Sequence, residues 1–205
     1  MNCLLRVEVI AMVLLQLVTA SDRIAGRWGS EQRSVGGLGI AFEFSDRGKC
    51  DKITGVMVDG RWSLRGDKLT RVLPTGQGKS ETQSIVVSIH GNSMTQLIDG
   101  ERRVLKRVRD AASSADSIDG LWTYRHEAGG IAYEDYGPYG RFLFRLPAAT
   151  ESCSWEVIGN RLRLSVNGIT TEYTFSIAGD VLALNHEGER QVFRRENILP
   201  PPLKQ

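Results

Sequence analysis

The chain has 205 residues and is nearly neutral, with 26 basic and 24 acidic side chains and a formal charge of +2. Its length suits one large domain or two small ones. A charge this evenly balanced argues against nucleic acid and against an anionic membrane surface as partners, because both attract strongly basic proteins.

The first 20 residues are typical of an export signal. Arg6 precedes a mostly apolar run from Val9 to Val18, and Val18-Thr-Ala20 is a small-residue site for cleavage before Ser21. The run is too short for a membrane-spanning helix, which needs about 20 apolar residues, so we expect no stable membrane span. A buried N-terminal helix is the alternative. The signal predicts a secreted or periplasmic protein.

Short extended segments separated by turns fill residues 22–109. Apolar side chains alternate at Ile85, Val87 and Ile89, and turn pairs such as Asp59-Gly60 predict hairpins between antiparallel strands. The predicted strands are residues 24–31, 38–45, 50–58, 61–65, 68–73, 83–90, 93–98 and 102–108. Residues 74–81 are predicted to be a loop, and the small polar segment 110–117 a linker.

Residues 118–197 follow the same plan with altered loops. A longer irregular stretch from Gly129 to Gly140 replaces the first hairpin. The later predicted strands are residues 141–146, 153–157, 161–166, 172–177, 181–185 and 190–195. The segment 198–205 contains three consecutive prolines and is predicted to be a flexible tail.

The two halves of the chain share three segments in the same order. The matching pairs are Ile24–Trp28 with Ile118–Trp122, Trp62–Leu69 with Trp155–Leu162, and Gly100–Arg107 with Gly188–Arg195. Three ordered matches indicate a duplicated unit of about ninety residues.

The fold class predicted from these patterns is all-β. An antiparallel meander whose last strand reaches its first strand closes into an up-and-down barrel and removes its exposed edges. We therefore predict two tandem small barrels, at residues 22–109 and 118–197. Since the first and last strands of a closed meander are neighbours, Arg107 and Arg195 are each expected to stack on the tryptophan that opens the barrel, a contact worth about 0.5–2 kcal/mol.

Each repeat resembles the lipocalin-like small β-barrel domains of secreted bacterial proteins. The resemblance rests on an initial Gly-x-Trp, a middle tryptophan element and a closing Gly-Glu-Arg strand with its arginine. The residues in these motifs are Gly26, Trp28, Trp62 and Arg107 in the first repeat, and Gly120, Trp122, Trp155 and Arg195 in the second. The resemblance implies structural roles for them and a barrel that holds a small ligand. Each unit is about half the length of a ligand-carrying lipocalin.

Two cysteines follow the predicted signal, Cys50 and Cys153. In an exported chain they could form a disulfide, which would join one repeat to the other. Two separate buried thiols are an equal alternative, because sequence does not reveal how closely the two residues approach.

Catalytic and metal-binding motifs are missing from the sequence. The three histidines, His90, His126 and His186, lie in no metal-ligand spacing, and the chain has neither a nucleophile elbow nor a phosphate-binding glycine loop. We predict a protein that is not an enzyme and that uses no metal or cofactor.

The densest group of aromatic and polar residues lies between positions 124 and 139. Its members are Tyr124, His126, Tyr133, Glu134, Tyr136 and Tyr139. Tyrosine rings suit an amphipathic ligand, and a histidine and a carboxylate could orient it. The leading prediction is a binding protein for a small apolar or amphipathic ligand. The alternative is a protein-interaction or envelope-structural module with side-chain-filled barrels, whose partner is another envelope or secreted protein.

Overall fold

The computed structural model describes residues 23–76, 78–108 and 116–196. The predicted signal, residues 110–115 of the predicted linker and the predicted tail lie outside them. The described residues form fourteen strands and a single-turn 3-10 helix, η1 (Pro138–Gly140), and none of their helices is long and apolar enough to cross a membrane. All strand pairs are antiparallel and follow the chain up and down, which confirms the all-β prediction.

The strands divide evenly between the two repeats. Those of the first repeat are β1 (Gly26–Ser30), β2 (Leu38–Phe44), β3 (Lys49–Arg65), β4 (Lys68–Gly76), β5 (Lys79–His90), β6 (Ser93–Ile98) and β7 (Glu101–Arg107). Those of the second are β8 (Gly120–Arg125), β9 (Ile131–Gly137), β10 (Arg141–Ile158), β11 (Arg161–Val166), β12 (Ile169–Ala178), β13 (Val181–His186) and β14 (Glu189–Glu196). The stretch predicted to be irregular, Gly129–Gly140, therefore contains β9, the counterpart of β2.

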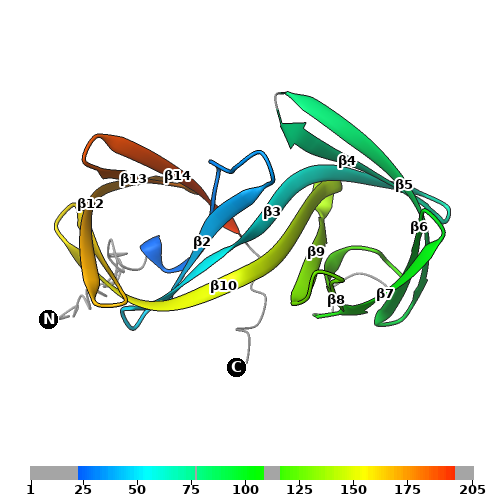
Figure 1. Ribbon diagram of the computed structural model, residues 1–205, viewed down its shortest axis with the longest axis horizontal. Helices are drawn as coiled ribbons and strands as arrows, with labels where there is room; N and C mark the ends of the chain where they lie inside the picture. Colours follow the sequence, from blue (N-terminus) through cyan, green and yellow to red (C-terminus); the bar gives the residue numbers. More distant parts are fainter. Residues whose placement is uncertain (1–22, 77, 109–115, 197–205) are drawn as a thin grey trace, which may run out of the picture.

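The strands form one closed ring, not a separate barrel from each repeat. Each strand pairs with its neighbours in sequence, and β1 pairs with β14 to close the ring. A further ladder between β3 and β10, over residues 49–61 and 141–154, crosses the middle of the ring. Figure 1 shows these two long strands running side by side through the centre of the molecule, with a lobe at each end.

Both lobes contain strands from both repeats. Lobe 1 consists of β1, β2, the first part of β3, the last part of β10 and β11–β14. Lobe 2 consists of the last part of β3, β4–β9 and the first part of β10. The two repeats have thus exchanged their first strands. The prediction of one barrel per repeat differs from this arrangement because β3 and β10, with 17 and 18 residues, each extend through both lobes.

The predicted turn at Asp59-Gly60 is wrong, because β3 continues straight through it. Gly60 is needed there for close packing: a Cβ atom at this position would lie 2.5 Å from the backbone oxygen of Val72. Gly55, five residues earlier on β3, is needed for the same reason, because a Cβ atom there would overlap the backbone oxygen of Leu146 on β10. Both glycines let neighbouring backbones approach, a role that a turn prediction does not consider.

Each lobe encloses its own hydrophobic cluster, as alternating side chains along the strands predict. In β5, for example, Ile85 and Val87 are buried while Val86 and Ser88 are exposed. The cluster in lobe 1 contains Trp28, Phe42, Phe44, Trp155, Leu164, Leu184 and Phe193 among others, and the cluster in lobe 2 contains Leu69, Ile85, Met94, Leu105, Trp122, Tyr136 and Phe142 among others.

In each lobe the guanidinium group of an arginine stacks on a buried tryptophan of the hydrophobic cluster. The guanidinium of Arg195 lies 4.2 Å from the ring centre of Trp28, and that of Arg107 lies 4.1 Å from the ring centre of Trp122. The predicted stacking occurs, but each pair joins the two repeats. The reason is the closure of the ring, which makes β14 the neighbour of β1, and β7 the neighbour of β8.

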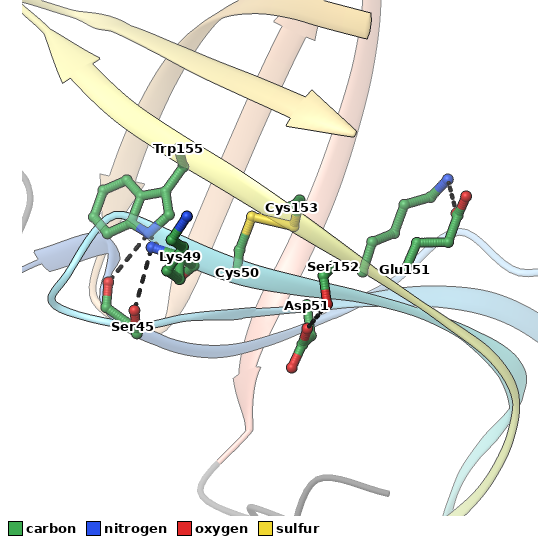
Figure 2. The surroundings of a disulfide bond; sticks show 9 residues. Ser45, Lys49, Cys50, Asp51, Glu151, Ser152, Cys153 and Trp155 are labelled. Carbon is green, nitrogen blue, oxygen red and sulfur yellow. Dashed lines mark hydrogen bonds and ion pairs between the residues drawn. A yellow bond between two sulfur atoms is a disulfide. The ribbon is translucent and has the colours of Figure 1, made fainter. Parts of the chain in front are cut away.

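A disulfide between Cys50 and Cys153 ties β3 to β10 inside lobe 1, with the two Cα atoms 4.7 Å apart. Figure 2 shows it beside Trp155, whose indole N–H donates to the backbone oxygens of Ser45 and Lys49, each at 3.1 Å. The bond therefore joins the two repeats, as one of the two sequence alternatives proposed.

A double-mutant cycle tests the strand exchange. We expect the W28L and R195M substitutions to couple by about 0.5–2 kcal/mol in the free energy of unfolding, because they remove two halves of one cation–π contact. The W28L and R107M pair should show coupling near zero, since these residues lie in different lobes. Urea unfolding of the single and double variants measures both values. Coupling in the second cycle alone would mean that each repeat closes on itself.

Removal of the disulfide should lower the stability of the whole ring. The bond joins residues 103 positions apart, and cross-links of long loops contribute about 2–4 kcal/mol, chiefly by restricting the unfolded chain. The C50A/C153A variant should therefore lose about that much free energy of unfolding in urea. The wild-type protein unfolded in reductant is the control and should match the variant. Equal stability of the variant and the oxidised protein would contradict the expectation.

Candidate ligand-binding site

Four polar side chains meet inside lobe 2, among residues that are otherwise apolar. They are Arg71 on β4, Gln96 on β6, and Glu134 and Tyr136 on β9, and we refer to them as the polar quartet. Gln96, Glu134 and Tyr136 have 0% exposed surface, and Arg71 is also buried. The strand exchange creates the group, since its first two members belong to the first repeat and its last two to the second.

One carboxylate oxygen holds the polar quartet together. Oε2 of Glu134 accepts hydrogen bonds from Arg71 Nη2 at 2.6 Å, from Gln96 Nε2 at 2.8 Å and from the Tyr136 hydroxyl at 2.8 Å. Arg71 also donates to the Tyr136 hydroxyl, and its guanidinium lies over the ring of Phe142. A buried carboxylate paired in this way is costly to separate from its partners, so the group is fixed as a unit.

Burial and charge shift the pKa values of Tyr136 and Arg71. Burial together with the nearby Glu134 carboxylate raises the pKa of Tyr136 well above its usual value, so its hydroxyl stays protonated. Burial would lower the pKa of Arg71, but the charge of Glu134 and the interactions with Tyr136 together outweigh it, and the pKa rises. Arg71 therefore stays protonated, 2.6 Å from the Glu134 carboxylate.

Three atoms of the quartet make no hydrogen bond to any described residue. They are Arg71 Nε, Gln96 Oε1 and Glu134 Oε1, all fully enclosed. Buried polar groups in native proteins nearly always have partners, and an unpaired one costs about 1–3 kcal/mol. Free hydrogen-bonding capacity of both kinds, one donor and two acceptors, is thus present inside lobe 2.

The duplicated architecture provides an internal comparison for this group. Aligning the two repeats by their strand registers matches Arg71 with Leu164, Gln96 with Leu184, Glu134 with Phe42 and Tyr136 with Phe44. All four counterparts are apolar and buried in the hydrophobic cluster of lobe 1. The same fold is therefore built with apolar side chains at these positions, and the quartet is not a requirement of the architecture.

A cleft opens in the wall of lobe 2 close to the quartet. Its volume is about 730 Å³, and it lies where β7 and β8 separate. The lining residues are Ile98, Asp99, Glu101, Arg102, Arg103, Val104, Tyr124, Arg125 and Glu127. They include apolar, cationic and anionic side chains, a mixture that suits a ligand with both apolar and charged parts.

Arg103 and Tyr124 connect the cleft to the polar quartet. The guanidinium of Arg103 lies 4.4 Å from the centre of the Tyr124 ring, and its Nη1 is 3.9 Å from Oε1 of Glu134. Burial and the Glu134 carboxylate raise the pKa of Tyr124 to about 12, so this hydroxyl is also neutral. The stacked pair thus lies between the quartet and the cleft, with Arg103 31% exposed.

The predicted site residues divide into two groups. Tyr124, Glu134 and Tyr136 come together at the cleft end of lobe 2, and the His126 ring lies 6.0 Å from that of Tyr124. Tyr133 lies on the opposite face of β9, packed with Leu121 and Leu143, and Tyr139 is 99% exposed in η1. The two-residue period of a strand separates Tyr133 from its neighbours.

Sequence reasoning did not identify Arg71, Gln96 and Arg103. Each is a single polar residue at an interior position of an otherwise alternating strand, a signal visible in the sequence only when the two repeats are aligned strand by strand. Their meeting with Glu134 depends on which strands become neighbours.

A second buried ionic group lies outside both hydrophobic clusters and joins the lobes, and we refer to it as the seam. Glu196 on β14 accepts hydrogen bonds from Arg27 Nε and Arg145 Nε, both at 3.0 Å. Arg145 also pairs with Asp59 at 2.7 Å. Asp135 on β9 lies beside this group, only 7% exposed, with Arg141 at 3.3 Å.

Comparison of the chain with protein-family models, with curated proteins and with solved structures found no match. The interpretation of the site therefore depends on the geometry of this molecule and on the comparison between its own two lobes.

The seam should make stability depend on pH through Asp135. Burial raises the pKa of its carboxyl to about 6 from the ordinary 3.8, although Arg141 and Arg145 oppose the shift. Because folding disfavours the ionised form, the stabilisation that this group contributes is complete below pH 3.8 and is lost as the pH rises through 6. The gap corresponds to about 2–3 kcal/mol.

Urea unfolding of the wild type and of the D135N variant between pH 4 and 7.5 tests this dependence. The wild type should lose about 2–3 kcal/mol relative to the variant over that range, and effects of other carboxyl groups cancel in the difference. A D67N variant, altered in the exposed β3–β4 turn, is the control and should run parallel to the wild type. Parallel curves for D135N would show that Asp135 titrates normally.

Proposed function

We propose that the protein is an exported binding protein made of two lipocalin-like repeats with exchanged strands, and that lobe 2 holds a small amphipathic ligand carrying a negative charge. The disulfide supports a secreted or periplasmic location, because such bonds persist mainly in oxidising compartments. The ligand enters through the cleft between β7 and β8.

The observation that carries this proposal is the difference between the two lobes at four equivalent interior positions. Lobe 1 has Leu164, Leu184, Phe42 and Phe44 where lobe 2 has the polar quartet. Replacing a buried ion pair by well-packed apolar residues is often neutral or stabilising. The quartet is therefore better explained by recognition than by stability, and it lies in the lobe with the cleft.

The charges at the inner end of the cleft support an anionic group on the ligand. Arg71 and Arg103 face the single carboxylate of Glu134, so two cations meet one anion at the inner end of the cleft. The cleft lining as a whole is balanced, with Arg102, Arg103 and Arg125 against Asp99, Glu101 and Glu127. An anionic group next to Arg103 balances the second cation. The apolar part of the ligand then contacts Ile98, Val104 and the ring of Tyr124.

Lobe 1 has a structural role in this proposal. Its interior contains the apolar cluster and the Cys50–Cys153 disulfide, and it holds the strands β3 and β10 that continue into lobe 2. The alternative, a protein-interaction module with filled lobes, suits lobe 1 but gives no reason for the polar quartet in lobe 2.

Titration with 8-anilinonaphthalene-1-sulfonate, a fluorescent amphipathic anion, tests the proposal. The R103A variant should bind the probe at least tenfold more weakly, since a charge-assisted hydrogen bond is worth about 1.5–3 kcal/mol. The Q191A variant is the matched control, because Gln191 is the counterpart of Arg103 in lobe 1, and its affinity should stay within twofold of the wild type.

A second variant transfers the interior of lobe 1 to lobe 2. The R71L/Q96L/E134F/Y136F protein carries the four residues that lobe 1 already packs, so it should fold, and it should bind the probe more weakly because Arg103 loses the Glu134 carboxylate that orients it. Equal affinities of the wild type, R103A and Q191A, or no binding by the wild type, would refute the proposed site.

A further inference from the structure

The junction between β7 and β8 is shorter than the equivalent junction in lobe 1. In lobe 2 the ladder contains only the pairs Lys106↔Thr123 and Arg107↔Trp122. In lobe 1 the ladder continues to Ser30↔Phe193, and the N–H of Glu31 donates to the backbone oxygen of Val192 at 2.8 Å. On this side lobe 1 thus has one additional pair, Ser30↔Phe193, and one additional hydrogen bond, from Glu31 to Val192. Their counterparts in lobe 2 are Leu105 with Tyr124 and Val104 with Arg125, which line the cleft or border it.

The direction of the backbone groups on β7 follows from the hydrogen bonds beyond its end. The N–H of Val108 donates to Leu121 of β8 at 2.8 Å, whereas that of Arg107 donates to Asn92 on the β6 side at 3.0 Å. Backbone groups alternate along a strand, so those of Val104 and Arg102 point toward β8, where the ladder has ended. The edge of β7 is thus available for pairing over the length of the cleft.

The side chains beside this edge specify what can pair with it. Arg103 and Leu105 face the interior of the lobe, while Arg102 and Val104 face outward. In an antiparallel pair, residues directly opposite each other have their side chains on the same face. An added strand would place one inward side chain opposite Arg103, where the partly exposed guanidinium favours a carboxylate.

We propose that the ligand of this cleft is an extended peptide segment that adds an antiparallel strand to β7 and places an acidic side chain against Arg103. This inference rests on the proposed function and specifies its ligand. Main-chain hydrogen bonds to Val104 and Arg102 supply affinity, as in other cases of strand addition, and the contact with Arg103 supplies specificity. The edge from Glu101 to Leu105 has room for about five residues, at roughly 3.4 Å per residue.

The probe that tests it is the blocked pentapeptide Ac-Thr-Val-Asp-Val-Thr-NH2. It should displace 8-anilinonaphthalene-1-sulfonate from the wild-type protein and slow the exchange of the Arg102 and Val104 amide hydrogens at least tenfold, measured by NMR. A peptide with asparagine in place of the aspartate should bind about tenfold more weakly to the wild type and equally to R103A.

N-methylated peptides separate strand pairing from simple charge attraction. In the proposed register the two valines direct their N–H groups to β7, and the aspartate directs its N–H away. Methylation of both valine nitrogens should abolish binding, whereas methylation of the aspartate nitrogen should change affinity less than threefold.

The outcomes distinguish the inference from the function on which it rests. If the sulfonate probe binds and depends on Arg103, but the pentapeptide neither displaces it nor protects the two amides, the proposed function stands and the peptide inference is wrong. If the R103A variant binds the sulfonate probe as tightly as the wild type, both the proposed function and the peptide inference are wrong. Equal loss with either methylation pattern would also overturn the β7 pairing.

Discussion

The ladder between β3 and β10 is the constraint on which the rest of the molecule depends. Without it, fourteen strands closed by β1 and β14 would surround an interior too wide for side chains to fill. By crossing the ring, the two long strands divide it into lobes that each enclose a hydrophobic cluster. Gly55 and Gly60 permit the close backbone approach, and the disulfide fixes the ladder within lobe 1.

The exchange of strands lets the two lobes diverge while the repeats stay similar. The closing contacts are duplicated, with Arg195 on Trp28 and Arg107 on Trp122, whereas the interiors differ. Lobe 2 combines Arg71 of one repeat with Glu134 of the other, so neither repeat alone contains the polar quartet. One lobe with an apolar interior and one lobe with a polar group in its interior thus arise from the same duplicated sequence.

The exchange of strands produces two buried ionic groups, the seam and the polar quartet, which differ in their surroundings. The seam joins the lobes through Arg27, Glu196 and Arg145, and each of these side chains has a charged partner, although Nη1 of Arg27 makes no hydrogen bond to a described residue. The quartet in lobe 2 retains unpaired atoms and stands next to a cleft. Both groups contain unpaired buried atoms, so the position of the quartet next to the cleft is what distinguishes it and is the basis of the ligand site that we propose.

Much of the local structure can be predicted from the sequence. Alternating apolar residues and turn pairs predict the antiparallel strands, three repeated segments indicate the duplication, and closeness in the chain groups Tyr124, Glu134 and Tyr136. Which strands become neighbours depends on the folded chain. Backbone hydrogen bonds are the same for β1 with β7 as for β1 with β14, so the repeat pattern satisfies both pairings equally well. For that reason the partner of Trp28, the straight path through Gly60, and the meeting of Arg71 and Gln96 with Glu134 could not be read from the chain.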